Sequence, residues 1–255
     1  MLSFAFIITI AALSQTATTV AIPSTTESSK LNIIAAAKQA RKAFDEGITA
    51  KNAGDFSKAE KLFSVVVNLI PSWALAHLEL GIALISKNPK DPRAIAAFEQ
   101  AVNLDSNNAR AHFELGSAYQ QQNRLDDAVR ELLLALEKRT NQIDTMILLA
   151  SVYSQNNNSD KAIEIYHQIL QNKPGHVGAL AAMSVCYENL GKLDRAEAAL
   201  VTIARLHPSV LYHRYRLAEF YERIGEYDKA DKIYYELELI DPRQRKMRKL
   251  PKARR

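Results

Sequence analysis

The sequence predicts an all-α fold, a solenoid of antiparallel helix pairs, because three series of residues recur about every 34 positions. One series is alanine, with one step of 35 residues and four of 34: Ala59, Ala94, Ala128, Ala162, Ala196 and Ala230. A small residue recurs one helix earlier: Gly47, Gly81, Gly116, Ala150, Ser184 and Ala218. A large residue follows each alanine by four positions: Phe63, Phe98, Leu132, Tyr166, Leu200 and Tyr234. Each period is expected to hold two helices that approach closely at the small residues, with the large side chain beside them.

Two further series complete the pattern. Tyrosine recurs at Tyr119, Tyr153, Tyr187 and Tyr221, and proline closes four periods at Pro71, Pro174, Pro208 and Pro242. The order of small residue, aromatic residue, alanine, large apolar residue and proline resembles the tetratricopeptide repeat. This resemblance spans residues 40–244 and implies six repeats in a right-handed superhelical α-solenoid. It also implies a protein-interaction scaffold and not an enzyme.

The turns between the two helices of each repeat carry their own signal. Gly54, Gly191 and Gly225 stand where the first helices of repeats one, five and six should end, and glycine commonly ends a helix in the left-handed conformation. Asn123 and Asn157 stand there in repeats three and four, and asparagine tolerates that conformation next best. In repeat two, two prolines within residues 87–93 predict an enlarged turn that holds the extra residue, or a loop that contacts a partner.

The first 21 residues carry no charged side chain, and Leu2–Leu13 is mostly apolar. This segment resembles a secretory signal peptide cleaved near Ala21, which predicts an exported, periplasmic or secreted protein. An uncleaved membrane anchor and a cytosolic protein are the alternatives. The next part, residues 22–39, is expected to be a Ser/Thr-rich linker, Ile22–Ser29, followed by the start of a helix near Leu31.

A basic tail, residues 243–255, accounts for the net charge of +5. It contains eight Lys or Arg residues and no acid, which leaves 25 basic against 28 acidic residues elsewhere (33 − 8 = 25). Five of the eight are the candidate anion-binding residues: Arg243, Arg245, Lys246, Arg248 and Lys249. The tail is expected to cap the solenoid, beginning as a short helix after Asp241, or to bind an anionic membrane or polymer surface. Nucleic acid is a disfavoured partner because no base-reading module accompanies the charge.

Motifs for chemistry are missing from the sequence. It has no Gly-rich phosphate loop, no nucleophile elbow and no HExxH motif, so we expect no cofactor and no catalytic residue. His77 and His112 occupy the same position in repeats two and three. Equivalent positions lie roughly 10 Å apart, too far to share a zinc ion, so we expect packing histidines and no metal. Cys186 is expected to be a small buried side chain.

The resemblance places partner binding on the first helices, whose second, fifth, ninth and twelfth residues line a groove in this family. These positions supply eight candidate residues: Phe44, Ile48, Leu75, Leu78, Ile82, Phe113, Tyr212 and Tyr215. Those in repeats one to three are apolar, as expected for a surface that binds a peptide or an amphipathic helix of a partner protein. Alternatively, the chain's own segment Leu31–Lys38 or close packing of the repeats covers them.

The chaperone-binding branch of the family grips a carboxylate with Lys and Asn. Phe44, Ile48 and Ile82 stand at the corresponding positions here, so that function is disfavoured. A six-repeat protein with a signal segment resembles the family's periplasmic and outer-membrane assembly factors, including those for pili. The pilus factors carry a lipidation cysteine, which this signal-like segment lacks. The sequence therefore favours an adaptor in an exported or cell-envelope complex. A protein recruited to anionic surfaces by its tail and a cytosolic regulator are the alternatives.

Overall fold

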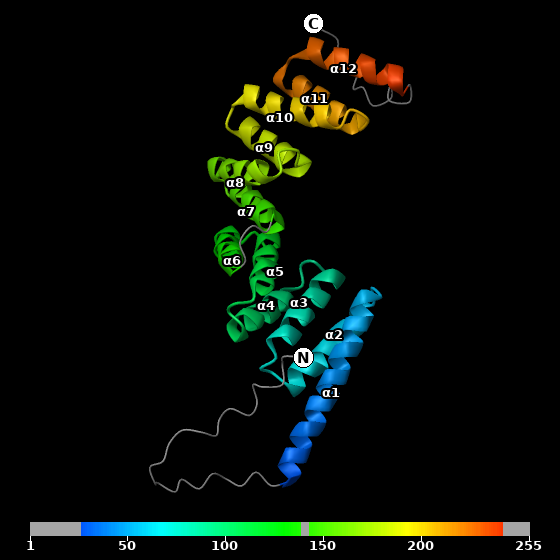
Figure 1. The fold of residues 1–255 in the computed structure, drawn as a ribbon, viewed down its shortest axis with the longest axis vertical. Coiled ribbons are helices and arrows are strands. Elements are labelled where there is room, and N and C mark those ends of the chain that lie inside the picture. The colour runs from blue at the N-terminus through cyan, green and yellow to red at the C-terminus, as the bar shows by residue number, and fades with distance from the viewer. Residues whose placement is uncertain (1–26, 139–142, 242–255) are drawn as a thin grey trace. The chain divides into compact units, whose positions relative to one another are not determined.

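The computed structural model describes residues 27–138 and 143–241. Within these residues the fold is all-α, with twelve helices and no strand: α1 (Glu27–Asn52), α2 (Phe56–Leu69), α3 (Ala74–Lys87), α4 (Pro92–Leu104), α5 (Ala109–Gln121), α6 (Leu125–Lys138), α7 (Ile143–Gln155), α8 (Ser159–Asn172), α9 (Val177–Asn189), α10 (Leu193–Leu206), α11 (Leu211–Ile224) and α12 (Tyr227–Ile240) (Figure 1). No helix in the described ranges is both long and apolar enough to cross a membrane. The signal-like segment and the basic tail lie outside the described residues.

The chain divides into two compact units, residues 1–39 and 40–255. In the first unit, α1 begins at Glu27, so the predicted helix start near Leu31 was four residues late. The Ser/Thr content of Ile22–Ser29 suggested a linker, but Ser28 and Ser29 lie inside the helix.

In the second unit, six helix pairs follow one another, each made of a first helix (the part of α1 from Ala40, then α3, α5, α7, α9 and α11) and a second helix (α2, α4, α6, α8, α10 and α12). The six repeat alanines are all buried. In repeat two, a Cβ atom built on Gly81 would lie only 2.4 Å from Cε1 of Phe98, so the small and large residues of the pattern do meet where the two helices cross. The sequence periodicity therefore marks the contact that holds each pair together.

The turns confirm the positions predicted to be left-handed. Asn123 and Asn157 have φ of 60° and 57°, and Gly54, Gly191 and Gly225 have φ between 68° and 84°. Immediately after each of these residues, a backbone N–H donates to the carbonyl five residues earlier, as Arg124 does to Tyr119 (3.0 Å or less in all five turns). This bond satisfies a carbonyl that the helix end would otherwise leave without a partner.

The turn of repeat two confirms the predicted enlargement. It spans residues 88–91, one residue more than the corresponding turn of repeat three, 122–124. The Asp91 side chain accepts a hydrogen bond from the Arg93 backbone (3.0 Å), and Pro92 occupies the first position of α4. Glu60 in α2 pairs with Lys87 and with Arg93, each at 2.9 Å. These two basic residues flank the enlarged turn, so the ion pairs join it to repeat one.

Candidate functional site

The eight predicted groove residues differ widely in exposure. Leu78 is 1% exposed, and Phe44 is buried against the rings of Phe63 (5.6 Å between centroids) and Trp73 (4.7 Å). Ile48, Ile82, Phe113 and Tyr215 are half-buried. Leu75 is 39% exposed and Tyr212 is 62% exposed. The fifth residue of the first helix thus packs inward in repeats one and two, whereas the second residue faces solvent in repeats two and six.

Ion pairs join the first helices of repeats one to three. Glu79 in α3 is buried and pairs with Lys51 in α1 (2.5 Å) and Arg110 in α5 (3.6 Å). Arg110 also approaches Glu114, one helical turn along α5 (3.7 Å). Burial raises the pKa of the Glu114 carboxyl, and the charge of Arg110 opposes this shift only in part. We give the name first-helix patch to the apolar Ile48, Leu75, Ile82 and Phe113 together with these charged residues, all on the first helices of repeats one to three.

The two candidate tyrosines of repeat six belong to a different part of the array. Tyr215 packs edge-on against Tyr234 (5.4 Å between centroids), and its hydroxyl pKa is raised by burial, with smaller contributions from Glu219 and Glu222. Tyr212 accepts a hydrogen bond from Arg216 (3.3 Å) at the edge of a small cavity of about 80 Å³ between α9, α10 and α11. Tyr215 packs against the core of repeats four to six, whereas Phe44 and Ile48 belong to the core of repeats one and two. The eight residues therefore pack in different parts of the array's core.

Repeat tyrosines form a set of contacts that the sequence analysis missed. Tyr119 donates a hydrogen bond to Glu99 (2.7 Å) and Tyr221 donates one to Glu197 (2.6 Å). The Tyr187 hydroxyl and Nε2 of His167 lie 3.1 Å apart. Each partner belongs to the second helix of the preceding repeat, so these bonds join neighbouring repeats. Burial, followed by the hydrogen bond to Glu99, raises the pKa of Tyr119 to about 12.

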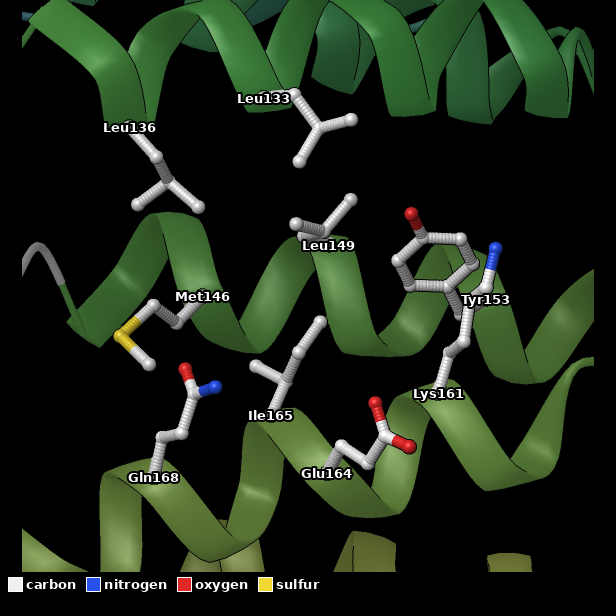
Figure 2. Close-up of a pocket in the computed structure, with 9 residues that line it drawn as sticks. All are labelled: Leu133, Leu136, Met146, Leu149, Tyr153, Lys161, Glu164, Ile165 and Gln168. Atoms are coloured by element: carbon white, nitrogen blue, oxygen red, sulfur yellow. The ribbon is translucent and has the colours of Figure 1, made fainter.

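Between α6, α7 and α8 lies a cleft of about 400 Å³ that the sequence analysis also missed (Figure 2). Its apolar lining comes from all three helices: Leu133, Leu136, Met146, Leu149 and Ile165. Its polar lining comes from α7 and α8: Tyr153, Lys161, Glu164 and Gln168. A signal was present in the sequence, because Leu133 stands 20 residues before Tyr153, as the polar Glu99 and His167 stand before Tyr119 and Tyr187.

The two candidate histidines make structural hydrogen bonds. Nε2 of His77 lies 2.9 Å from the carbonyl of Pro71, and Nε2 of His112 lies 3.1 Å from the carbonyl of Ser106. His112 also contacts Glu131 through Nδ1 (2.8 Å). Both rings are thus held by hydrogen bonds within the fold. In the described part of the chain, no three His, Cys, Asp or Glu residues gather as a metal site would need. Cys186 is buried, as predicted.

Family models match three stretches of the sequence. A model described as TPR repeat matches residues 90–123, and two models described as tetratricopeptide repeat match residues 153–214 and 187–244. A search of the curated proteins finds no match.

Solved structures share the fold. The crystal structure of the MamA protein is 26% identical over 68% of this chain and 93% of that chain, with a TM-score of 0.64. YrrB, described as a TPR protein with an unusual peptide-binding site, is 20% identical over 71% of this chain and 92% of that chain (TM-score 0.55). A structure of Pseudomonas aeruginosa pilF is 18% identical over 82% and 94% of the two chains (TM-score 0.60). At their identities, the last two show the fold alone. With six helix pairs, the repeat residues at their crossings and these matches, the chain is a tetratricopeptide-repeat protein, built as a scaffold for protein interactions.

Proposed function

We propose that this protein is an exported, non-enzymatic adaptor whose first-helix patch binds an apolar segment of a partner during assembly of an exported or cell-envelope complex. One observation carries the proposal. Leu75 is 39% exposed, and the half-buried Ile48 and Ile82 occupy the ninth position of the first helices of repeats one and two. Exposed apolar surface bounded by charged residues is typical of protein interaction sites. An amphipathic helix or an extended peptide is the partner segment that suits it.

The fold supports the same assignment. YrrB is described as having a peptide-binding site, so an array of this fold holds a peptide in at least that protein. Here the ion pairs of Glu79 with Lys51 and Arg110 cross from one first helix to the next. They hold the apolar side chains in a fixed arrangement before a partner arrives, which reduces the entropy lost on binding.

Photo-crosslinking in cells tests the proposal. A photoreactive amino acid is placed at Leu75 or, as a control of similar exposure on a second helix, at Val201 (41% exposed). A specific partner adduct from position 75 and none from position 201 is expected. Adducts of equal yield at both positions would contradict a specific patch. A self-adduct to Leu31–Lys38 would show that the chain covers the patch itself and would contradict partner binding there.

Export rests on the uncharged first 21 residues and is tested on the same purified protein. Mass spectrometry of the mature N-terminus is expected to find cleavage near Ala21. An intact N-terminus on a membrane-bound protein would indicate an anchor, and an intact N-terminus on a cytosolic protein would indicate a cytosolic regulator.

A second candidate function is recruitment to an anionic membrane or polymer by the basic tail. The eight basic residues within 243–255, with no acid among them, favour it. Deletion of residues 243–255 separates the two functions. If binding to anionic vesicles is lost while the adduct at Leu75 persists, both functions are present and independent. If the adduct disappears as well, the tail carries the interaction.

A further inference from the structure

The repeat tyrosines show what is unusual about the cleft between α6 and α8. Tyr119 and Tyr187 each contact the polar residue 20 positions earlier, Glu99 and His167. Tyr221 has Val201 at that position and donates instead to Glu197, 24 positions earlier. A tyrosine hydroxyl buried between helices normally finds such a partner, because leaving it without one costs free energy.

Tyr153 is the exception in this series. Leu133 stands 20 positions before it, and within the described residues the Tyr153 hydroxyl has no hydrogen-bond partner. Lys161 lies over its ring, with Nζ 5.2 Å from the centroid. Lys161 has no ion pair in the described ranges either, although Glu164 is three residues away on the same helix. Tyr153, which is half-buried, and Lys161, which is exposed, therefore both have no acceptor among the described residues at the same end of the cleft.

The cleft beside these donors is apolar and open to solvent. Leu133 is 48% exposed, and Met146, Leu149 and Ile165 line the cleft with it. Figure 2 shows these side chains converging from the three helices, with the Tyr153 hydroxyl directed into the same space. A volume of about 400 Å³ lies within the range of pockets that hold ligands, and it is large enough for a large side chain and its neighbour.

We propose that this cleft is a second protein-binding site, which takes a partner segment that inserts a large apolar side chain and offers a carboxylate to the Tyr153 hydroxyl and the Lys161 ammonium. A hydrogen bond to a charged acceptor is stronger than one between neutral groups, and the inserted apolar side chain would displace water from the lining beside it. Glu164 also lines the cleft and repels acidic groups, so the carboxylate is expected to lie at the end with Tyr153 and Lys161. The site is formed by α6, α7 and α8 and does not depend on the first-helix patch.

Methyl NMR of the full-length protein with three small probes tests this chemistry. The probe 4-phenylbutyrate has an apolar ring and a carboxylate, 4-phenylbutyramide is its neutral analogue, and 4-phenylbutylamine is its cationic analogue. The carboxylate is expected to shift the methyl signals of Leu133, Leu149 and Ile165, with affinity at least about tenfold above that of the amine. Equal affinities of the three probes, or no shift at these methyl groups, would overturn the proposal.

A single substitution should close the site. Leu133→Glu places a carboxylate where Glu99 serves Tyr119, so it supplies the missing acceptor and is expected to abolish probe binding. Val201→Glu is the matched control at the equivalent position of repeat five, where Tyr221 already has Glu197. Tyr153→Phe removes the donor with little change in shape and is expected to weaken the carboxylate probe several-fold and the amide less, because a hydrogen bond to a neutral acceptor is weaker. Loss of binding in Val201→Glu to the same extent would overturn the assignment.

The source of the ligand is tested with displayed random heptapeptides, selected on the wild-type protein and counter-selected on Leu133→Glu. Enrichment of peptides that combine one large apolar residue with one Asp or Glu is expected. If no such peptides are enriched although 4-phenylbutyrate binds, the cleft serves a small organic acid and the proposed protein partner is wrong. Enrichment of basic peptides would overturn the proposed charge preference.

Discussion

The first and second halves of the array make the same helix crossing with different residues. In repeats one to three the small residue is glycine, and a Cβ built there would lie 2.4 to 2.8 Å from the opposing Phe63, Phe98 or Leu132. In repeats four to six the small residue is alanine or serine, buried opposite Tyr166, Leu200 or Tyr234. The two halves therefore combine side chains of different size at the crossing, glycine with Phe or Leu in the first half and alanine or serine with Tyr or Leu in the second. Because protein interiors are closely packed, a Cβ atom at the small position is accommodated only where the crossing helices leave room for it.

The largest expected effect comes from removing the ring that faces a glycine. Phe98→Ala should lower the free energy of unfolding by about 3–5 kcal/mol, because Phe98 is fully buried and Gly81 offers no side chain to fill the space. Denaturation with urea measures it. Leu200→Ala, opposite Ser184, is the comparison and should cost less because fewer atoms are removed. An equal or larger loss for Leu200→Ala would contradict the proposed difference between the halves.

Exchanging the small residues should give a smaller and asymmetric effect. Gly81→Ala is expected to cost about 1–3 kcal/mol from overpacking against Phe98. Ala150→Gly should cost roughly 0.5–1 kcal/mol, from helix propensity and backbone entropy. The double change Gly81→Ala with Phe98→Leu is expected to recover part of the loss. If the losses measured for Gly81→Ala alone and for Phe98→Leu alone simply add in the double variant, the two side chains are not coupled and the comparison fails.

The left-handed turn residues are expected to contribute about 1 kcal/mol each. Asn157→Ala should destabilise the protein by roughly that amount, because alanine at a φ of 57° suffers the clash that asparagine tolerates better. Asn157→Gly should be neutral or slightly stabilising. Thermal unfolding measures the difference in stability between the two variants. An Ala variant as stable as the Gly variant would mean that the turn can change its conformation without cost.

The smallest effects depend on pH and have opposite signs in two carboxylates. Hydrogen bonds from Lys87 and Arg93 hold the pKa of Glu60 below its ordinary value, whereas burial holds that of Glu114 above it. Ionised Glu60 therefore stabilises the fold above the ordinary glutamate pKa of about 4.3, and this contribution is lost as pH falls through its lowered folded pKa. Ionised Glu114 destabilises the fold at neutral pH, and this cost disappears as pH falls below its unfolded pKa.

Thermal melts of Glu60→Gln and Glu114→Gln over pH 3–8 compare how the two carboxylates contribute to stability. The first variant should melt below the wild type at pH 7 and the second at or above it, and both differences should shrink in acid. Parallel behaviour of the two variants would show that the two environments are equivalent.

The sequence predicted the helix pairs well because the residues that define them act within one repeat. The alanine at each crossing, the left-handed Asn123 and Asn157, and the enlarged turn after Lys87 all follow from local conformation and from packing within one pair. Contacts between repeats were harder. Leu78 occupies a position typical of a groove yet is 1% exposed. Its burial depends on how close the neighbouring helices lie, and the sequence period does not determine that distance.

The cleft at Tyr153 was missed for a related reason. The sequence analysis used the repeat tyrosines only to establish the period, and the hydroxyl partners of Tyr119, Tyr187 and Tyr221 belong to the repeat before. The residue 20 positions earlier is polar for Tyr119 and Tyr187 but apolar for Tyr153 and Tyr221, and only the structure shows that Tyr221 bonds to Glu197 instead. The predicted signal segment and the basic tail stay predictions.

The turn at residues 88–91 shows how a repeat array accommodates a repeat that is one residue longer than the others. One extra residue enters the chain there, and the next helix restarts at its own cap, Asp91, so the 34-residue spacing resumes and every later side chain keeps its neighbour. An insertion inside α4 would instead rotate all following residues of that helix by about 100°. The turn absorbs the extra residue without rotating the faces of the following helices, and it is where a protein engineer should add a tag or a loop.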